Sequence, residues 1–234
     1  MTTVKRTARI TGLAYLGLAI SGMLGYLLIR NQLYVPGDAT GTAANLVAHE
    51  GLARLGIVAD VAMVLTQAVT AVSFWTLFRP VHPIAAGSIA AFGLVNAVVI
   101  LVAAACSATA LDVALRADAM STSEVLLLYD LYTAVFSLAG LFFGLWLIPM
   151  GWLAGRSGYM PRPLGWILIG GGIGYVVSVL VAALFPDASG VVYALTVPAT
   201  IGELWMVGYL LTKGVAGRST TDGRPTTSLE AALA

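Results

Sequence analysis

The sequence has very few of the residues on which most metal and redox sites are built. Its 234 residues include one cysteine, Cys106, and two histidines, His49 and His82. One cysteine excludes an internal disulfide and any site that requires a cysteine pair. The two histidines fall on opposite sides of the expected bundle, which excludes a His-rich di-iron site and a bis-His haem. We therefore expect neither a metal ion nor a cofactor.

The motifs of phosphate and acyl-transfer chemistry are also missing. The sequence contains no Gly-Lys phosphate loop, no Asp-rich repeat that would hold magnesium on a diphosphate, and no Gly-x-Ser-x-Gly elbow. A net charge of +1 gives no indication of nucleic-acid binding. What remains is metal-free acid–base chemistry by carboxylates, or reversible binding of a ligand or a proton.

Charged residues are scarce, and apolar residues take their place. Charged residues make up 10% of the chain and hydrophobic residues 59%, whereas soluble domains carry about 25% charge. Six apolar segments reach the length of about 17–25 residues that spans a bilayer: Ile10–Ile29, Leu55–Phe78, Ile84–Cys106, Val125–Ile148, Leu164–Phe185 and Val192–Leu211. The sequence therefore predicts an all-α, polytopic membrane bundle with six transmembrane helices.

The connections between these segments are short, so residues 1–213 are predicted to form one transmembrane domain. Residues 214–234 are rich in Thr, Ser and Gly and are predicted to be a disordered cytoplasmic tail. The positive-inside rule gives the orientation. Nine basic residues fall on the side of the N-terminus and three on the other side: Lys5, Arg6, Arg9, Arg79, Arg156, Arg162, Lys213, Arg218 and Arg224 against Arg30, Arg54 and Arg116. Both termini are therefore predicted to be cytoplasmic.

The longest outer connection, residues 31–51, follows the first span. Pro36-Gly37 indicates a turn, and Asp38 is suited to cap a short amphipathic helix over Ala39–His49. We expect this helix to lie on the outer membrane surface as a lid. Glu50 and Arg54 follow at i,i+4 spacing, which is typical of an interfacial ion pair and also suits the mouth of a pocket.

Three carboxylates lie inside apolar segments: Asp60, Asp130 and Glu203. An ionisable group at membrane depth is costly and marks a pocket, an ion path or a catalytic acid by default. At about 1.5 Å per helical residue, these carboxylates and Asn96 are expected to meet in the outer half of the bilayer. No basic residue is expected at their depth, and Arg54 at the rim is the nearest cation.

Glu203 and Asp60 are the candidate catalytic acids. Gln67 lies seven residues after Asp60, on the same helix face and one layer deeper. The remaining candidate ligand-binding residues are Glu50, Arg54, Asn96, Asp130, Tyr129, Tyr132, Tyr175 and Trp205. The alternative is that these polar side chains only form hydrogen bonds across helix interfaces, as they often do in membrane proteins.

Several motifs resemble those of a known family. The early ones are Tyr34–Ala39, Thr42–Asn45, Glu50–Gly56 and Asp60, and the later ones are Arg156–Arg162, the glycine run up to Tyr175, and Ile201–Trp205. Across about residues 8–212, the chain resembles the domain-of-unknown-function 4386 family of bacterial membrane proteins. The resemblance implies a six-helix protein of the bacterial cytoplasmic membrane and implies no particular activity. The matching motifs include Asp38, Asn45, Glu50, Arg54, Asp60 and Glu203, whereas Asp130 lies outside them.

Three functions remain open. The first is an intramembrane enzyme in which Glu203 or Asp60 protonates an isoprenoid-like lipid and aromatic faces stabilise the cation, by analogy of architecture with small integral-membrane terpene cyclases. The second is a proton-coupled small-molecule transporter, which suits acids near the midplane and a helix interrupted by Pro198. The third is a non-catalytic lipid-binding or accessory protein. The expected partner is a membrane lipid or an apolar small molecule, and the sequence leaves the oligomeric state open.

These functions predict different structures. The enzyme predicts an aromatic-lined cavity that contains Glu203 and opens laterally to lipid. The transporter predicts a polar path that reaches both membrane faces. The accessory protein predicts that the acids pair with Asn96, Gln67 or Arg54 and that no cavity remains.

Overall fold

The computed structural model describes residues 3–116 and 121–215. Over these residues the chain is all-helical, and six helices are long and apolar enough to cross a membrane, which confirms the predicted fold class. The first span is continuous but changes its winding, from α1 (Thr3–Gly22) through the π-helical η1 (Met23–Ile29) to α2 (Arg30–Leu33). The other five spans are α4 (Glu50–Phe78), α5 (Pro83–Leu115), α6 (Ser121–Ser157), α7 (Arg162–Leu184) and α8 (Ser189–Thr212).

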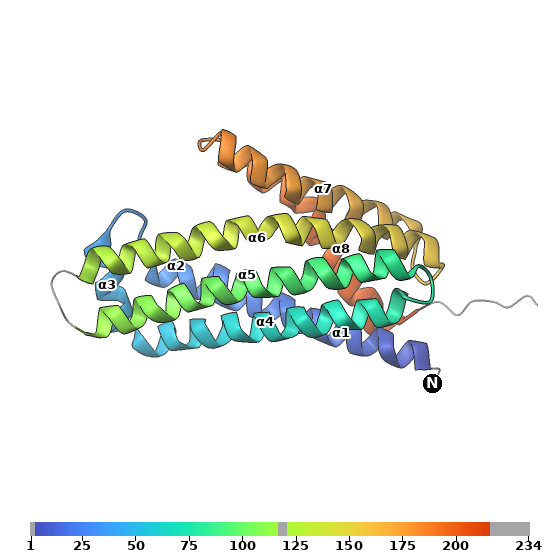
Figure 1. The fold of residues 1–234 in the computed structure, drawn as a ribbon, viewed down its shortest axis with the longest axis horizontal. Coiled ribbons are helices and arrows are strands. Elements are labelled where there is room, and N and C mark those ends of the chain that lie inside the picture. Colours follow the sequence, from blue (N-terminus) through green and yellow to red (C-terminus); the bar gives the residue numbers. More distant parts are fainter. Residues whose placement is uncertain (1–2, 117–120, 216–234) are drawn as a thin grey trace, which may run out of the picture.

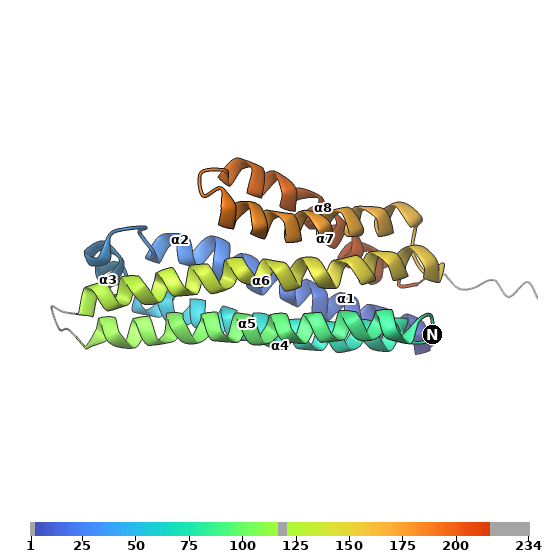
Figure 2. The same cartoon turned by 45° about the horizontal axis from the view of Figure 1, so that its top comes forward.

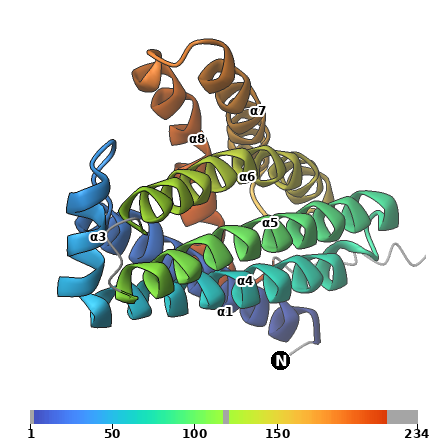
Figure 3. The same cartoon turned by 60° about the vertical axis from the view of Figure 1, so that its left-hand side comes forward.

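The spans form a bundle with a projecting hairpin. The first span, α4, α5 and α6 run side by side, α7 packs along α6, and α8 returns between α7 and α1 (Figures 1 and 2). The α7–α8 hairpin leans away from the other helices towards its connecting turn (Figure 3). The two described ends of the chain lie together, since a Cβ on Gly214 would be 3.9 Å from the backbone oxygen of Lys5. The predicted tail, apart from its first two residues, lies outside the described part of the chain.

Glycines bring α7 into backbone contact with both of its neighbours. On the α6 side, a Cβ on Gly151 would lie 2.5 Å from the carbonyl oxygen of Gly165. On the α8 side, a Cβ on Gly171 would lie 2.5 Å from the amide nitrogen of Ala199, and one on Gly174 would overlap the carbonyl oxygen of Leu195. Such contacts are typical of small residues at membrane helix interfaces. They fix α8 against α7 within two turns of Glu203.

The short outer helix forms where the sequence predicts it. It is α3 (Ala39–Ala48), and the Asp38 side chain caps it by accepting a hydrogen bond of 2.8 Å from the backbone nitrogen of Gly41. Thr42 and Leu46 are fully buried, and α3 packs on α5 and α6. The helix therefore closes one end of the bundle with its apolar face (Figure 3).

At the other end of the bundle, His82 caps α5. Its Nδ1 accepts a hydrogen bond of 3.2 Å from the backbone nitrogen of Ala85, and its ring lies edge-on to Trp152 with ring centroids 5.2 Å apart. The imidazole thus occupies the place of the usual Ser, Thr, Asp or Asn cap.

We expect His82→Ala to lower the free energy of unfolding by about 1 kcal/mol, because the cap acceptor is lost. His82→Asn is the matched control, since it also loses the contact with Trp152 but keeps an acceptor. Thermal unfolding of both variants in the same detergent measures the difference. Equal melting temperatures for the two variants would show that the cap contributes nothing.

Candidate functional site

Each of the three carboxylates in the apolar segments accepts a hydrogen bond from a tyrosine on another helix or loop. Tyr15 donates to Glu203 at 2.5 Å, Tyr132 to Asp60 at 3.2 Å, and Tyr34 to Asp130 at 2.5 Å. Among the described residues, no hydrogen bond joins any two of the four side chains that were expected to meet, Asp60, Asp130, Glu203 and Asn96. The structure therefore distributes the acids over separate tyrosine pairs.

Asp60 is the centre of an outer polar cluster. Asp60 lies on α4 and is 4% exposed. A Cβ on Gly25 of η1 would lie 2.9 Å from Asp60 Oδ1, so a glycine is needed opposite the carboxylate. A cavity of about 20 Å³ lies beside it, which is enough for one water molecule. Ser107 of α5 lines the same cavity as Asp60.

Arg30 belongs to this cluster, and the sequence analysis missed it. Its guanidinium lies over the rings of Tyr26, Tyr34 and Tyr132 at 5.0, 4.9 and 5.9 Å from their centroids. It also donates a hydrogen bond of 2.6 Å to Thr133, and it lines the cavity beside Asp60. The expectation that Arg54 would be the nearest cation is therefore wrong. The reason is that the first span continues beyond Ile29 as a helix, which keeps Arg30 against the bundle.

Asp130 and its neighbours extend the outer cluster to the surface. Asp130 is exposed and holds the hydroxyl of Tyr34, whose ring stacks on Tyr129 at 5.7 Å. Burial, together with the hydrogen bond to Asp130, raises the pKa of the Tyr34 hydroxyl, so that it remains a donor at neutral pH. Tyr129 and Tyr132 both line the cavity at Asp60. These tyrosines, which the sequence assigned to ligand binding, are thus brought together with Asp60.

Glu203 lies in a second, more aromatic cluster. It is partly buried on α8, and the residue that donates to it, Tyr15 of α1, is 2% exposed. The Tyr15 ring is edge-on to Phe74 and Trp146, with centroids 5.5 and 5.6 Å away. Tyr175 of α7 lies close enough for an electrostatic interaction with Glu203, and its ring contacts Phe143 at 5.4 Å. Helices α1, α6, α7 and α8 therefore all contribute to the surroundings of Glu203.

The two buried amides on α4 and α5 stand apart from the acids. Gln67 Nε2 donates to the carbonyl oxygen of Gly93 at 3.4 Å. Within the described residues, no partner is present for Gln67 Oε1, for either polar atom of Asn96, or for the indole nitrogen of Trp146. Buried polar atoms of this kind require a partner such as an internal water. Trp146 also contacts Tyr15, so this group lies next to the Glu203 cluster without touching the carboxylate.

The remaining candidate residues lie at the periphery. Glu50 and Arg54 form an ion pair of 2.7 Å with both side chains about half exposed, a setting in which ion pairs contribute little stability. Trp205 is 41% exposed on α8. Within the described residues, no group of three or more His, Cys, Asp or Glu side chains could hold a metal ion.

Three residues that the sequence analysis missed lie on the first span. Tyr15, Tyr26 and Arg30 are separated by 11 and 4 residues, or about three turns and one turn of helix. This spacing was the available signal. It points a stripe of hydroxyl and guanidinium groups towards the interior, and these groups serve both acid clusters.

Comparison with known proteins places the chain in a family. No curated protein and no solved structure matches it significantly. Residues 10–214 match the family model described as "Domain of unknown function (DUF4386)". This range contains all six spans except the first residues of α1, together with α3, Asp60 and Glu203. The chain is therefore a member of the DUF4386 family of multi-pass helical membrane proteins.

Proposed function

We propose that the protein is an intramembrane enzyme in which Glu203 protonates an apolar, isoprenoid-like lipid. The observation that carries the proposal is the setting of this acid. It accepts a hydrogen bond from the buried Tyr15, and Tyr175 lies close enough for an electrostatic interaction. Neutral carboxylic acids among apolar and aromatic groups are good proton donors.

The proposed chemistry needs no cofactor and regenerates the acid at the end of each cycle. The Glu203 proton moves to one carbon of an alkene, whose π electrons form the new C–H bond and leave a carbocation on the other carbon. A second alkene of the same molecule attacks the cation and closes a ring. The Glu203 carboxylate then removes a neighbouring proton, which forms an alkene and regenerates the acid. The π faces of Tyr15, Tyr175 and Phe143 would stabilise the positive charge.

The aromatic packing favours this proposal over a transporter. Tyr15 contacts Phe74, Phe74 stacks on Phe78 at 6.0 Å, and Phe78 stacks on Tyr159 at 6.3 Å. These rings form a continuous series of contacts from Tyr15, which donates to Glu203, towards the end of the bundle where the described termini lie. A polar path through both faces is therefore not supported.

Access for a lipid would come from the side. The α7–α8 hairpin leans away from the bundle (Figure 3), and the cavity beside Asp60, which Glu203 does not line, has room for one water molecule rather than for a lipid. Substrate binding would therefore require a helix to move. The first span contains the π-helical η1, and α8 contains Pro198 five residues before Glu203. Helices yield most readily at such points.

The test is proton incorporation from solvent. The protein in nanodiscs is incubated in D₂O with squalene or geranylgeraniol, whose alkenes would take the deuteron on carbon, and the extracted lipids are analysed by mass spectrometry. A proton-initiated cyclisation gives an isomer of the substrate that carries one deuterium. Unchanged substrates, together with an intact apolar lipid extracted from the protein, would contradict the enzyme and favour the lipid-binding alternative.

A further inference from the structure

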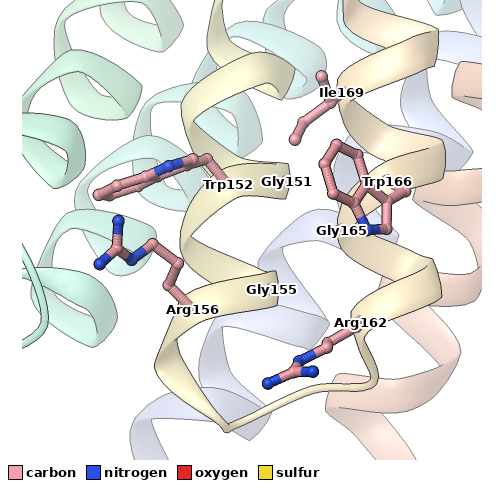
Figure 4. Close-up of a pocket in the computed structure, with 8 residues that line it drawn as sticks. All are labelled: Gly151, Trp152, Gly155, Arg156, Arg162, Gly165, Trp166 and Ile169. Atoms are coloured by element: carbon pink, nitrogen blue, oxygen red, sulfur yellow. The ribbon is translucent and has the colours of Figure 1, made fainter.

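A groove that shares no lining residue with either acid cluster lies where α6 ends and α7 begins. Its volume is about 550 Å³, and it is lined by Gly151, Trp152, Gly155, Arg156, Arg162, Gly165, Trp166 and Ile169 (Figure 4). The groove does not touch Glu203 or Asp60. What it can bind is therefore a question independent of the proposed chemistry.

The shape of the groove comes from glycines. The backbones of α6 and α7 touch at Gly151 and Gly165, where each Cβ would lie 2.5 or 2.6 Å from the other residue's carbonyl oxygen. One turn further along α6, a Cβ on Gly155 would meet nothing within 4 Å. The helices thus meet closely while leaving open space beside them, between the larger side chains.

The groove carries positive charge without a counter-charge. Arg156 and Arg162 are both exposed. Neither guanidinium has an ion-pair or hydrogen-bond partner among the residues that the structure describes. Arg156 lies over the ring of Trp152, 4.9 Å from its centroid. Two guanidinium groups on one groove match a phosphate, which arginine binds through paired hydrogen bonds.

The polarity of the groove changes along its length. Figure 4 places the two arginines nearest the turn between the helices, the two tryptophans further along, and Ile169 furthest from the turn. Trp166 is 73% exposed on the outside of the bundle. This order matches a phospholipid in one leaflet, with its phosphate at the water interface, its glycerol region beside interfacial tryptophans, and an acyl chain towards the apolar interior.

We propose that this groove is a binding site for one anionic phospholipid, whose headgroup is attracted by the positive charges of Arg156 and Arg162. Basic grooves between membrane helices are suited to such headgroups because the local charge adds to the apolar contact. A zwitterionic lipid offers the same phosphate but carries a cationic amine, which the two arginines disfavour. The site should therefore select phosphatidylglycerol over phosphatidylcholine.

Native mass spectrometry of the full chain tests the site. The protein is exchanged into nanodiscs of equal parts phosphatidylglycerol and phosphatidylcholine, and the lipids that remain bound after release are counted. We expect the parent to retain phosphatidylglycerol and the double variant Arg156→Gln/Arg162→Gln to retain about tenfold less. Arg79→Gln is the matched control, because Arg79 lies at the same end of the bundle and over a tryptophan, Trp75, at 4.8 Å, but outside the groove.

Three results would overturn the proposal. The first is that the double variant retains as much phosphatidylglycerol as the parent. The second is that Arg79→Gln loses as much as the double variant, which would indicate general charge attraction. Loss of the lipid on addition of 10 mM inorganic phosphate would assign the groove to free phosphate instead. Thermal unfolding of each variant verifies that the arginine substitutions leave the bundle folded.

Discussion

Replacing Gly174 with alanine is expected to leave little folded protein. The added Cβ would overlap the carbonyl oxygen of Leu195 on α8. A backbone atom cannot relieve the overlap by a change of rotamer, as a side chain can. Helices α7 and α8 would have to separate, and Gly171 would lose its contact with the backbone of Ala199 at the same time. We expect a loss of about 3 kcal/mol or more, at the upper end of the cost of overpacking.

Gly170→Ala is the matched control on the same helix. A Cβ at Gly170 would meet nothing within 4 Å, and alanine favours a helix over glycine by about 1 kcal/mol. This variant should melt at or above the temperature of the parent. Size-exclusion chromatography and thermal unfolding measure both variants. If Gly174→Ala melts like Gly170→Ala, the close packing of α7 on α8 is not needed for folding.

The sequence predicts the number and order of the spans because the bilayer imposes a simple requirement. A helix that crosses the membrane needs an apolar stretch of about 20 residues, and all six such stretches are helices in the structure. Asp38 likewise predicts the start of α3, since capping is a local interaction between a side chain and the next turn.

The ends of the spans are predicted less well. The fourth stretch was expected to end at Ile148, before Pro149, yet α6 continues to Ser157 with the proline inside it. The reason is tertiary packing. Met150, Leu153 and Ala154 beyond the proline are fully buried, and this burial outweighs the local cost of the proline. The first stretch was likewise ended too early, at Ile29, although the helix continues to Leu33, and this removed Arg30 from consideration.

The partners of the acids are the part that sequence could not supply. Depth along a helix follows from residue number, but the rotation of each helix about its axis does not. Asp60 and Glu203 were expected to meet because their depths agree. The structure turns Asp60 towards Tyr132 and Ser107, and Glu203 towards Tyr15. The hydrogen-bond partners of each acid are therefore set by the rotation of its helix and by the helices that pack against it.

Glu203→Gln is expected to abolish turnover while preserving the fold. The amide oxygen of glutamine can still accept the hydrogen bond from Tyr15, so the side chain keeps its place. It has no acidic proton to give. General acid catalysis contributes about 10²–10⁴ in rate, and deuterium incorporation should fall by at least that lower factor. Tyr15→Phe keeps the acid but removes the donor that holds it, so we expect a smaller loss, of about tenfold, in the same assay.

Asp60→Asn tests which of the two acid clusters carries the proposed reaction. Asp60 has its own hydrogen-bond donor, Tyr132, and a cavity with room for one water molecule only, so the rate of deuterium incorporation should stay within about threefold of the parent. The rates of the three variants are compared in nanodiscs of one composition, with thermal unfolding as the measure of folding. Loss of incorporation in Asp60→Asn but not in Glu203→Gln would make Asp60 the proton donor. The reaction would then take place in the outer cluster, where Arg30 lines the same cavity as Asp60 and its positive charge would oppose a developing carbocation.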